Sequence, residues 1–193
     1  MQSLRVILVD PSSTRSAILE QALRDAGLQV IGRFAECDML VDRISELQPD
    51  IVLVDIESPD RDTLESLQTV GRDNPRPIVV FAEDDSPDAI AAAVRAGVSA
   101  YVVDGLQPHR VRPIVEVAIA RFREFQALRR ELEATRSQLA ERKLIDKAKG
   151  LLMEHRNQTE AEAYASLRKL AMDRNQRIAE VARNVIDVFE LLG

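Results

Sequence analysis

Short apolar runs alternate with longer amphipathic segments through the first 120 residues of the chain. The runs consist mainly of Val, Ile and Leu, as expected for parallel strands that are buried on both faces. They lie at residues 6–9, 30–34, 51–54, 78–81 and 100–103. Helices are predicted at residues 13–26, 37–47, 61–73, 86–96 and 108–123. These β-α repeats predict an α/β domain over residues 1–120, with a doubly wound five-stranded parallel sheet.

A different pattern begins near residue 121. Apolar residues follow 3-4 spacing with polar residues between them, which is typical of a helix with a heptad seam. The seam residues are Phe125, Leu128, Leu132 and Leu139. Either the seam joins two chains in a parallel homodimer, or the helix packs on its own domain. We favour the homodimer, because helices of the first domain already cover its sheet, and we assign residues 121–140 to a coiled-coil linker.

Residues 141–193 predict a small all-α module of three helices. The first continues from the seam to about residue 155, and the others span about residues 159–174 and 176–191. Thr159 and Glu162 form a predicted capping box, and Asn175 is the predicted N-terminal cap of the third helix. Gly150 costs about 1 kcal/mol relative to Ala inside a helix, which suggests close packing or a surface that faces a ligand.

The small core of this module is predicted from the apolar positions that recur at helical spacing. Its residues are Ala148, Leu151, Leu152, Ala163, Leu167, Leu170, Ala171, Ile178, Val181, Ala182, Val185 and Ile186. The many alanines imply that the three helices approach one another closely.

Charge divides the chain near the same point. Residues 1–120 contain 11 Lys and Arg against 20 Asp and Glu, whereas residues 121–193 contain 15 against 12. Only the second part could therefore approach nucleic acid, and its basic residues must cluster on one face. No apolar run approaches the roughly 18 residues of a membrane span. With no signal peptide and Cys37 as the single cysteine, we expect a cytoplasmic protein.

Two aspartates follow predicted strands of the first domain. Asp10 follows the first strand and Asp55 follows the third. In an open α/β sheet, the carboxyl ends of the strands face the binding crevice. Two carboxylates there could hold Mg²⁺, and one could accept a phosphoryl group.

The first domain resembles the receiver domain of response regulators over about residues 4–120. The resemblance is carried by residues 8–10, 49–55, 59–60 and 96–101. It implies a sheet of the CheY and flavodoxin type. It also implies that Asp55 is the phosphoacceptor and that Asp10 is a metal-binding acid.

Three positions depart from the receiver pattern. Pro11 stands where receivers usually carry a second acid, Ala82 replaces a Ser or Thr, and Asp104 replaces a Lys. Without that lysine, the positive charge that stabilises the phosphoryl group is absent. We interpret the domain as a degenerate receiver that serves as a protein-interaction module and requires no cofactor. A regulator activated by phosphorylation of Asp55, acting on RNA or DNA, remains the alternative.

The C-terminal module resembles the ANTAR domain of the AmiR and NasT transcription antitermination regulators over about residues 137–193. The resemblance is carried by the motifs at residues 148–150, 152–153, 162–164, 167–168, 171–172 and 181–182. Residues 57–59 and 101–105 are most similar to the nitrate-responsive NasT branch. The resemblance implies binding to a leader messenger RNA with two hairpins, which prevents formation of the terminator.

The resemblance also implies partners. A homodimer would place one ANTAR module on each hairpin. The NasT branch implies control of nitrate and nitrite assimilation genes. It also implies a cytoplasmic NasS-like protein that senses nitrate or nitrite and restrains the regulator. We expect no enzymatic activity, because the sequence offers neither a nucleophile with a base nor a glycine loop for phosphate.

Hairpin loops expose unstacked bases, which proteins contact with polar and aromatic side chains while Lys and Arg hold the backbone. The predicted RNA-binding residues are Arg142, Lys143, Lys147, Lys149, Tyr164, Arg168, Lys169, Arg174 and Arg177. Tyr164 would stack on a base, or else be partly buried in the small core. A DNA-binding regulator would instead need a distinct recognition helix, and a signalling adaptor would bind neither nucleic acid.

Overall fold

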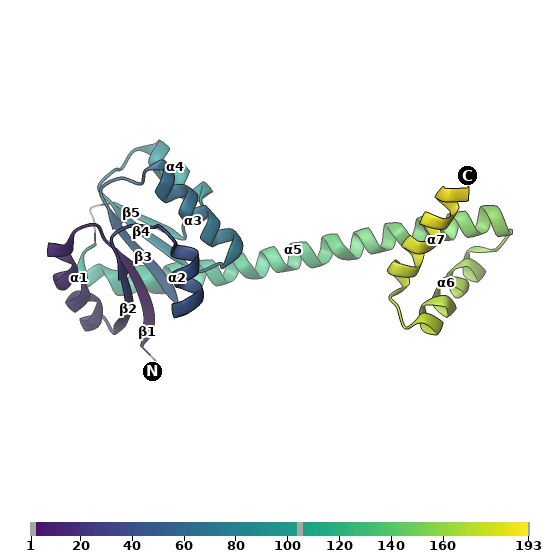
Figure 1. Cartoon of the computed structure of the whole chain (residues 1–193), viewed down its shortest axis with the longest axis horizontal. Coiled ribbons are helices and arrows are strands. Elements are labelled where there is room, and N and C mark those ends of the chain that lie inside the picture. The colour runs from purple at the N-terminus through teal and green to yellow at the C-terminus, as the bar shows by residue number, and fades with distance from the viewer. Residues whose placement is uncertain (1–2, 104–105, 193) are drawn as a thin grey trace. The chain divides into compact units, whose positions relative to one another are not determined.

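The structure is a computed structural model that describes residues 3–103 and 106–192, without the side chains of residues 13–18, 108 and 192. The chain forms two compact units, Met1–Gln126 and Ala127–Gly193. The strands of the first unit are β1 (Leu4–Val9), β2 (Leu28–Phe34), β3 (Ile51–Ile56), β4 (Ile78–Ala82) and β5 (Ala100–Val103). They form one parallel sheet in the order β2-β1-β3-β4-β5 (Figure 1). The predicted fold class is confirmed.

Helices cover both faces of this sheet (Figure 1). They are α1 (Ser13–Asp25), α2 (Leu40–Leu47), α3 (Arg61–Asp73), α4 (Pro87–Arg95) and the beginning of α5 (Pro108–Arg156). Successive side chains of a strand point to opposite faces, so each buried strand contributes to two cores. Ile7 and Val52 pack with α2, α3 and α4, whereas Leu8 and Leu53 pack with α1 and α5. This double burial explains the unbroken apolar runs of the sequence.

Local chemistry explains several helix ends of the first unit. Gly27 and Gly97 have φ values of 79° and 90° after α1 and α4, as expected for glycines that end helices. The side chain of Asp60 caps α3 by accepting a hydrogen bond from the N–H of Thr63. The predicted helix 37–47 begins three residues too early, because α2 starts at Leu40 after a turn at Cys37.

The predicted linker and the first helix of the C-terminal module belong to one continuous helix, α5, which contains 49 residues. The second unit contains the end of α5 with α6 (Glu160–Arg174) and α7 (Ile178–Leu192). Its core contains all the residues predicted for it, together with Leu144, Ile145 and Phe189. The capping box of Thr159 and Glu162 is present at the start of α6, with both reciprocal hydrogen bonds.

In the second unit, the predicted role of Asn175 is wrong, and one of the explanations suggested for Gly150 is excluded. Asn175 ends α6 in a left-handed conformation, with φ 51°, and does not cap the start of α7. Asn tolerates this conformation better than most residues, which explains its place here. A Cβ added at Gly150 would meet no atom within 4 Å, so close packing does not explain this glycine.

Candidate functional site

Asp10 and Asp55 lie at the carboxyl edge of the sheet, after β1 and near the end of β3. Because Val9 pairs with Val54, the two aspartates occupy adjacent positions on neighbouring strands. Their side chains are buried, with 3% and 4% exposed. One oxygen of Asp10 accepts a hydrogen bond of 2.8 Å from the N–H of Ser12. The structure therefore brings together the two carboxylates that the sequence singled out, while their roles stay predictions.

This carboxylate pair meets the minimum for Mg²⁺, which proteins often bind through one or two carboxylates while water completes the octahedron. Other donors at this edge are scarce. The carbonyl of Glu57 accepts hydrogen bonds from the N–H groups of Glu83 and Asp84, at 3.0 and 3.1 Å. The described residues contain no cluster of three or more metal-ligating side chains. If Mg²⁺ binds, Asp10 and Asp55 would hold it and water would supply most remaining ligands.

Two of the three positions that depart from the receiver pattern, Pro11 and Ala82, lie within the described residues. Ala82 ends β4 beside Ile56 and is fully buried, so no hydroxyl stands at this point. Pro11 follows Asp10 directly and contributes no carboxylate. Asp104 lies outside the described residues. A phosphoryl group on Asp55 would therefore lack the hydroxyl that could move towards it.

Asp84 joins three segments at this edge. Its carboxylate accepts hydrogen bonds from the N–H of Ser86 at 2.9 Å and from the hydroxyl of Ser58 at 2.8 Å. The bonds from Ser86, and then that from Ser58, hold the pKa of the Asp84 carboxyl below its usual value. The hydroxyl of Tyr101 donates to the Asp84 carbonyl at 2.7 Å. The loops after β3 and β4 are thus tied together, which the sequence did not reveal.

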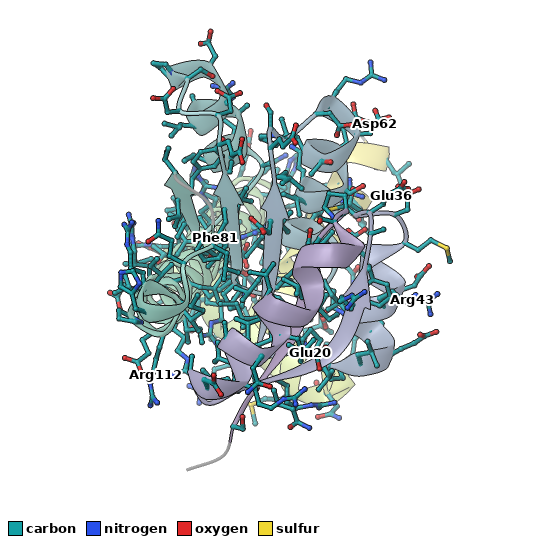
Figure 2. All side chains as sticks on the ribbon, turned by 90° about the vertical axis from the view of Figure 1, so that its left-hand side faces the viewer. Glu20, Glu36, Arg43, Asp62, Phe81 and Arg112 are labelled. Carbon is teal, nitrogen blue, oxygen red and sulfur yellow. The ribbon has the colours of Figure 1, made fainter. Side chains whose placement is uncertain are left out.

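A groove of about 850 Å³ borders this edge. Among the described side chains, the charged residues that line it are acidic: Glu36, Asp38, Glu57, Asp60 and Asp62. Figure 2 shows Glu36 and Asp62 on the same side of the unit, whereas Phe81 lies among the strands. Such a lining repels an anionic phosphodonor.

Cys37 lies in the wall of this acidic groove but is buried. Burial raises the pKa of its thiol to about 12, and the negative charges of Asp60 and Asp38 act in the same direction. The thiol therefore remains protonated at neutral pH, as expected for a packing residue rather than a nucleophile.

Four of the predicted RNA-binding cations form ion pairs within the second unit. Lys147 pairs with Glu190 at 2.6 Å, Arg142 with Asp146 at 3.9 Å, and Arg177 with Glu141 at 3.9 Å. The amine of Lys149 lies 2.8 Å from Asp146 and 2.7 Å from Glu160, and only 16% of this side chain is exposed. Its hydrogen bonds to Asp146 and Glu160 raise its pKa. Lys149 is therefore the least accessible of the predicted cations.

The other predicted cations are exposed and form no ion pair within the described part of the chain. They are Lys143, Arg168, Lys169 and Arg174. Arg156, which is not one of the predicted RNA-binding residues, is also exposed and without an ion pair among the described residues. Tyr164 is 44% exposed and is not among the residues that pack on the core of the second unit, so its stacking on a base stays a prediction. Unpaired cations can neutralise phosphates without first losing a carboxylate partner.

The seam of α5 is exposed. The side chains of Phe125, Leu128, Leu132 and Leu139 are between 50% and 63% exposed. This exposure favours the homodimer over the packing of the helix on its own domain, and the seam stays a prediction. Exposed apolar residues at heptad spacing favour pairing with another helix.

Comparison with known proteins decides the family. The model of the response regulator receiver domain matches residues 6–116, and that of the ANTAR domain matches residues 133–186. The transcriptional regulatory protein PdtaR of Mycobacterium tuberculosis is 30% identical over 183 residues, which cover 95% of this chain and 89% of PdtaR. This chain belongs to the response regulators that join a receiver domain to an ANTAR domain.

Other similarities are narrower. A nitrate regulatory protein of Klebsiella oxytoca is 46% identical over 65 residues, which cover 34% of this chain and 16% of that protein. The signal receiver domain of a modulated diguanylate cyclase from Desulfovibrio desulfuricans has a TM-score of 0.55 at 23% identity, over 62% of this chain and 96% of that one. The structural similarity supports the fold of the receiver domain alone. No described helix has both the length and the apolar character needed to cross a membrane.

Proposed function

We propose that this receiver–ANTAR protein is a transcription antitermination regulator that binds a two-hairpin leader RNA through its ANTAR domain. The observation that carries the proposal is a group of exposed cations inside the matched ANTAR region that form no ion pair within the described residues, among them Lys143, Arg156, Arg168, Lys169 and Arg174. Cations of this kind contact the phosphate backbone beside loop bases. Binding would hold the antiterminator fold, and polymerase would continue past the terminator.

The charges beside the seam support a parallel homodimer. With Phe125 and Leu132 at a positions, Glu124 and Glu131 occupy g positions, and Arg129 and Arg136 occupy e positions. In a parallel coiled coil, a g residue faces the e residue of the next heptad on the other chain. Each glutamate would then face an arginine. An antiparallel pairing would instead place glutamate against glutamate.

The control of the protein by a partner is also part of the proposal. We expect a cytoplasmic NasS-like sensor of nitrate or nitrite to restrain it, with nitrate or nitrite assimilation genes as targets. The short similarity to a nitrate regulatory protein supports the target class. The acidic groove and the buried Ala82 favour control by a protein contact over control by a kinase.

Activation by phosphorylation is the second candidate function. The buried pair of Asp10 and Asp55 favours it, because this pair could hold Mg²⁺ beside a phosphoacceptor. The missing hydroxyl at Ala82 and the acidic lining of the groove oppose it.

The main test is the binding of full-length protein to a two-hairpin leader RNA and to duplex DNA of similar length, measured by fluorescence anisotropy across a salt series. We expect selective binding to RNA without a phosphodonor. The logarithm of the affinity should fall by about 0.7 to 0.9 per phosphate contact for each decade of salt. A preference for DNA, or an affinity that does not depend on salt, would contradict the proposal.

The orientation of the homodimer has its own test. Glu131→Arg would place like charges together at the seam and should shift the protein towards monomer in sedimentation equilibrium. Adding Arg136→Glu restores opposite charges only if g residues face e residues, so the double variant should recover the dimer. A double variant that stays monomeric would argue against the parallel arrangement.

A further inference from the structure

A hollow of about 460 Å³ opens on the ANTAR domain, where the end of α5 meets α6 and α7. Its volume falls in the range of small-ligand pockets, which is about 300–1,000 Å³. The apolar part of its lining includes Leu152, Leu170, Val185 and Val188. The apolar core of the domain lies beneath the hollow and forms its base.

One wall of the hollow is aromatic. The rings of His155 and Phe189 stack with their centroids 4.8 Å apart and an angle of 19° between their planes. Phe189 is half-buried and packs on the core, whereas His155 is exposed. The pair therefore extends a flat surface from the core to solvent. Unpaired bases of RNA commonly stack on flat, partly exposed aromatic rings of this kind.

The rim of the hollow is basic. Arg156, Lys169 and Arg174 line it, and Asp173 is the one acidic residue among its described lining residues. The three cations form no ion pair within the described part of the chain, in contrast to Lys147 on the same domain, which pairs with Glu190. An apolar protein segment that covered this rim would bury three unpaired charges, which is costly. A polyanion would neutralise them and release counterions.

Uncharged polar side chains also line the hollow. Ser166 and Asn184 line it and can donate and accept hydrogen bonds. The hydroxyl of Ser166 accepts a bond of 3.3 Å from the side-chain amide of Gln158. The other amide atom, Oε1, is buried without a hydrogen-bond partner among the described residues. Gln158 itself does not line the hollow, so the uncharged polar groups that a base could contact there are those of Ser166 and Asn184.

From these features we propose that the hollow binds one unpaired nucleobase of an RNA hairpin loop. The base stacks beside His155 and Phe189, and its neighbouring phosphates contact Arg156, Lys169 and Arg174. The inference rests on the proposed RNA-binding function and adds the place where one base is held. It also gives Lys169 and Arg174 a different role from Tyr164, which does not line the hollow.

The test combines RNA and protein changes. Loop nucleotides of a leader hairpin are replaced by abasic residues one at a time, and full-length protein is titrated with each RNA. At one position, removal of the base should weaken wild-type binding by about 5- to 150-fold, the usual value of one stacked base. In the His155→Leu variant, removal of the same base should weaken binding only slightly further, because the substitution and the abasic position remove the same stacking interaction. His155 is exposed, so this variant should keep its fold.

Tyr164→Leu is the matched control, since it removes an exposed ring outside the hollow. In Tyr164→Leu, removal of the loop base should weaken binding as much as it does in the wild type. In Val188→Glu, which changes an exposed residue of the hollow, removal of the base should have little effect, as in His155→Leu. Circular dichroism and thermal unfolding check that each variant is folded. An abasic effect that disappears in Tyr164→Leu, or persists in both hollow variants, would overturn the proposed base site. Wild-type protein that binds no hairpin RNA would instead refute the proposed function itself.

Discussion

The two domains use ionisable side chains in opposite ways. At the carboxyl edge of the receiver sheet, the charged side chains that the structure describes in the groove are acidic, and the oxygens of Asp84 and Glu57 already accept hydrogen bonds. At the hollow of the ANTAR domain, three cations stand without carboxylate partners in the described structure. The first region offers little to an incoming anion, whereas the second offers charge that no protein group neutralises.

This difference shows why fold and activity need separate arguments. The receiver domain keeps the sheet order and the buried aspartates of its family, but the described charged side chains that line the groove at its edge are acidic and disfavour an anion there. Exposed cations cost the ANTAR domain little in water, because solvent hydrates them well. They become favourable when a polyanion releases its counterions. The response of each region to substitution should therefore differ in kind.

The largest expected effect concerns Cys37 in the receiver groove. With its thiol pKa raised from 9.0 to about 12, the thiolate fraction near pH 8 falls by about a thousandfold. Iodoacetamide should therefore label the folded protein far more slowly than the protein in urea. Labelling should accelerate as the pH rises towards 12, because the raised pKa favours the neutral thiol below it.

A control separates burial from charge at this position. Asp60→Asn keeps a capping side chain on α3 but removes the negative charge near Cys37. Protection should persist in this variant, since burial is the main cause of the raised pKa. If the folded wild type is labelled at a rate within tenfold of the unfolded rate, Cys37 is accessible to the reagent. The contrast between a closed receiver groove and an open ANTAR hollow would then fail.

The next effect concerns the rim of the ANTAR hollow. The double variant Lys169→Glu with Arg174→Glu should weaken binding to hairpin RNA by roughly 10- to 100-fold at low salt, because two phosphate contacts become repulsive. The matched control is Arg61→Glu with Arg72→Glu, which makes the same charge change in the receiver domain. Anisotropy should show little loss for the control. Equal losses would mean that total charge, rather than the ANTAR face, governs binding.

Much of the fold could be predicted because the sequence pattern has clear physical causes. Strands buried on both faces must be apolar throughout, which gave residues 51–54 and 78–81 to within two residues at their ends. The Thr159 capping box is likewise a local signal. Asn175 was misassigned because the same residue type favours both helix starts and left-handed helix ends.

The sites were less predictable, because they depend on contacts between distant residues. The sequence placed Asp10 and Asp55 together, since strand ends share one edge of a sheet. It could not show that Lys147 reaches Glu190, 43 positions away, or that Asp84 meets Ser58 and Tyr101. Arg156 and the rings of His155 and Phe189 were missed for the same reason. The one sequence signal for them is the helical spacing of residues 152–156, which places Leu152, His155 and Arg156 on one side of α5.

A smaller effect compares a free cation with a paired one. Lys169→Ala should lower the slope of the salt dependence by about one, as expected for one lost phosphate contact. Lys147→Ala should weaken RNA binding less and leave helicity intact, because this amine must first leave Glu190. Surface ion pairs are worth about 0–1 kcal/mol, so Glu190→Gln should strengthen binding by a few-fold at most. A stronger loss for Lys147→Ala would reverse the assignment of the two residues.

The smallest expected effect is at the receiver aspartate. Asp55→Asn should change terminator readthrough in a purified transcription reaction by less than about twofold. If phosphorylation of Asp55 controlled RNA binding allosterically, the affinity would usually change by about 5- to 150-fold. Asn keeps the size of the side chain while removing the phosphoacceptor, and the bonds of Asp84 already tie the nearby loops together. Asp10→Asn, at the adjacent buried position, controls for loss of charge. If a phosphodonor raises readthrough in the wild type but not in Asp55→Asn, phosphorylation at this edge governs the ANTAR domain, and the two regions are coupled rather than merely different.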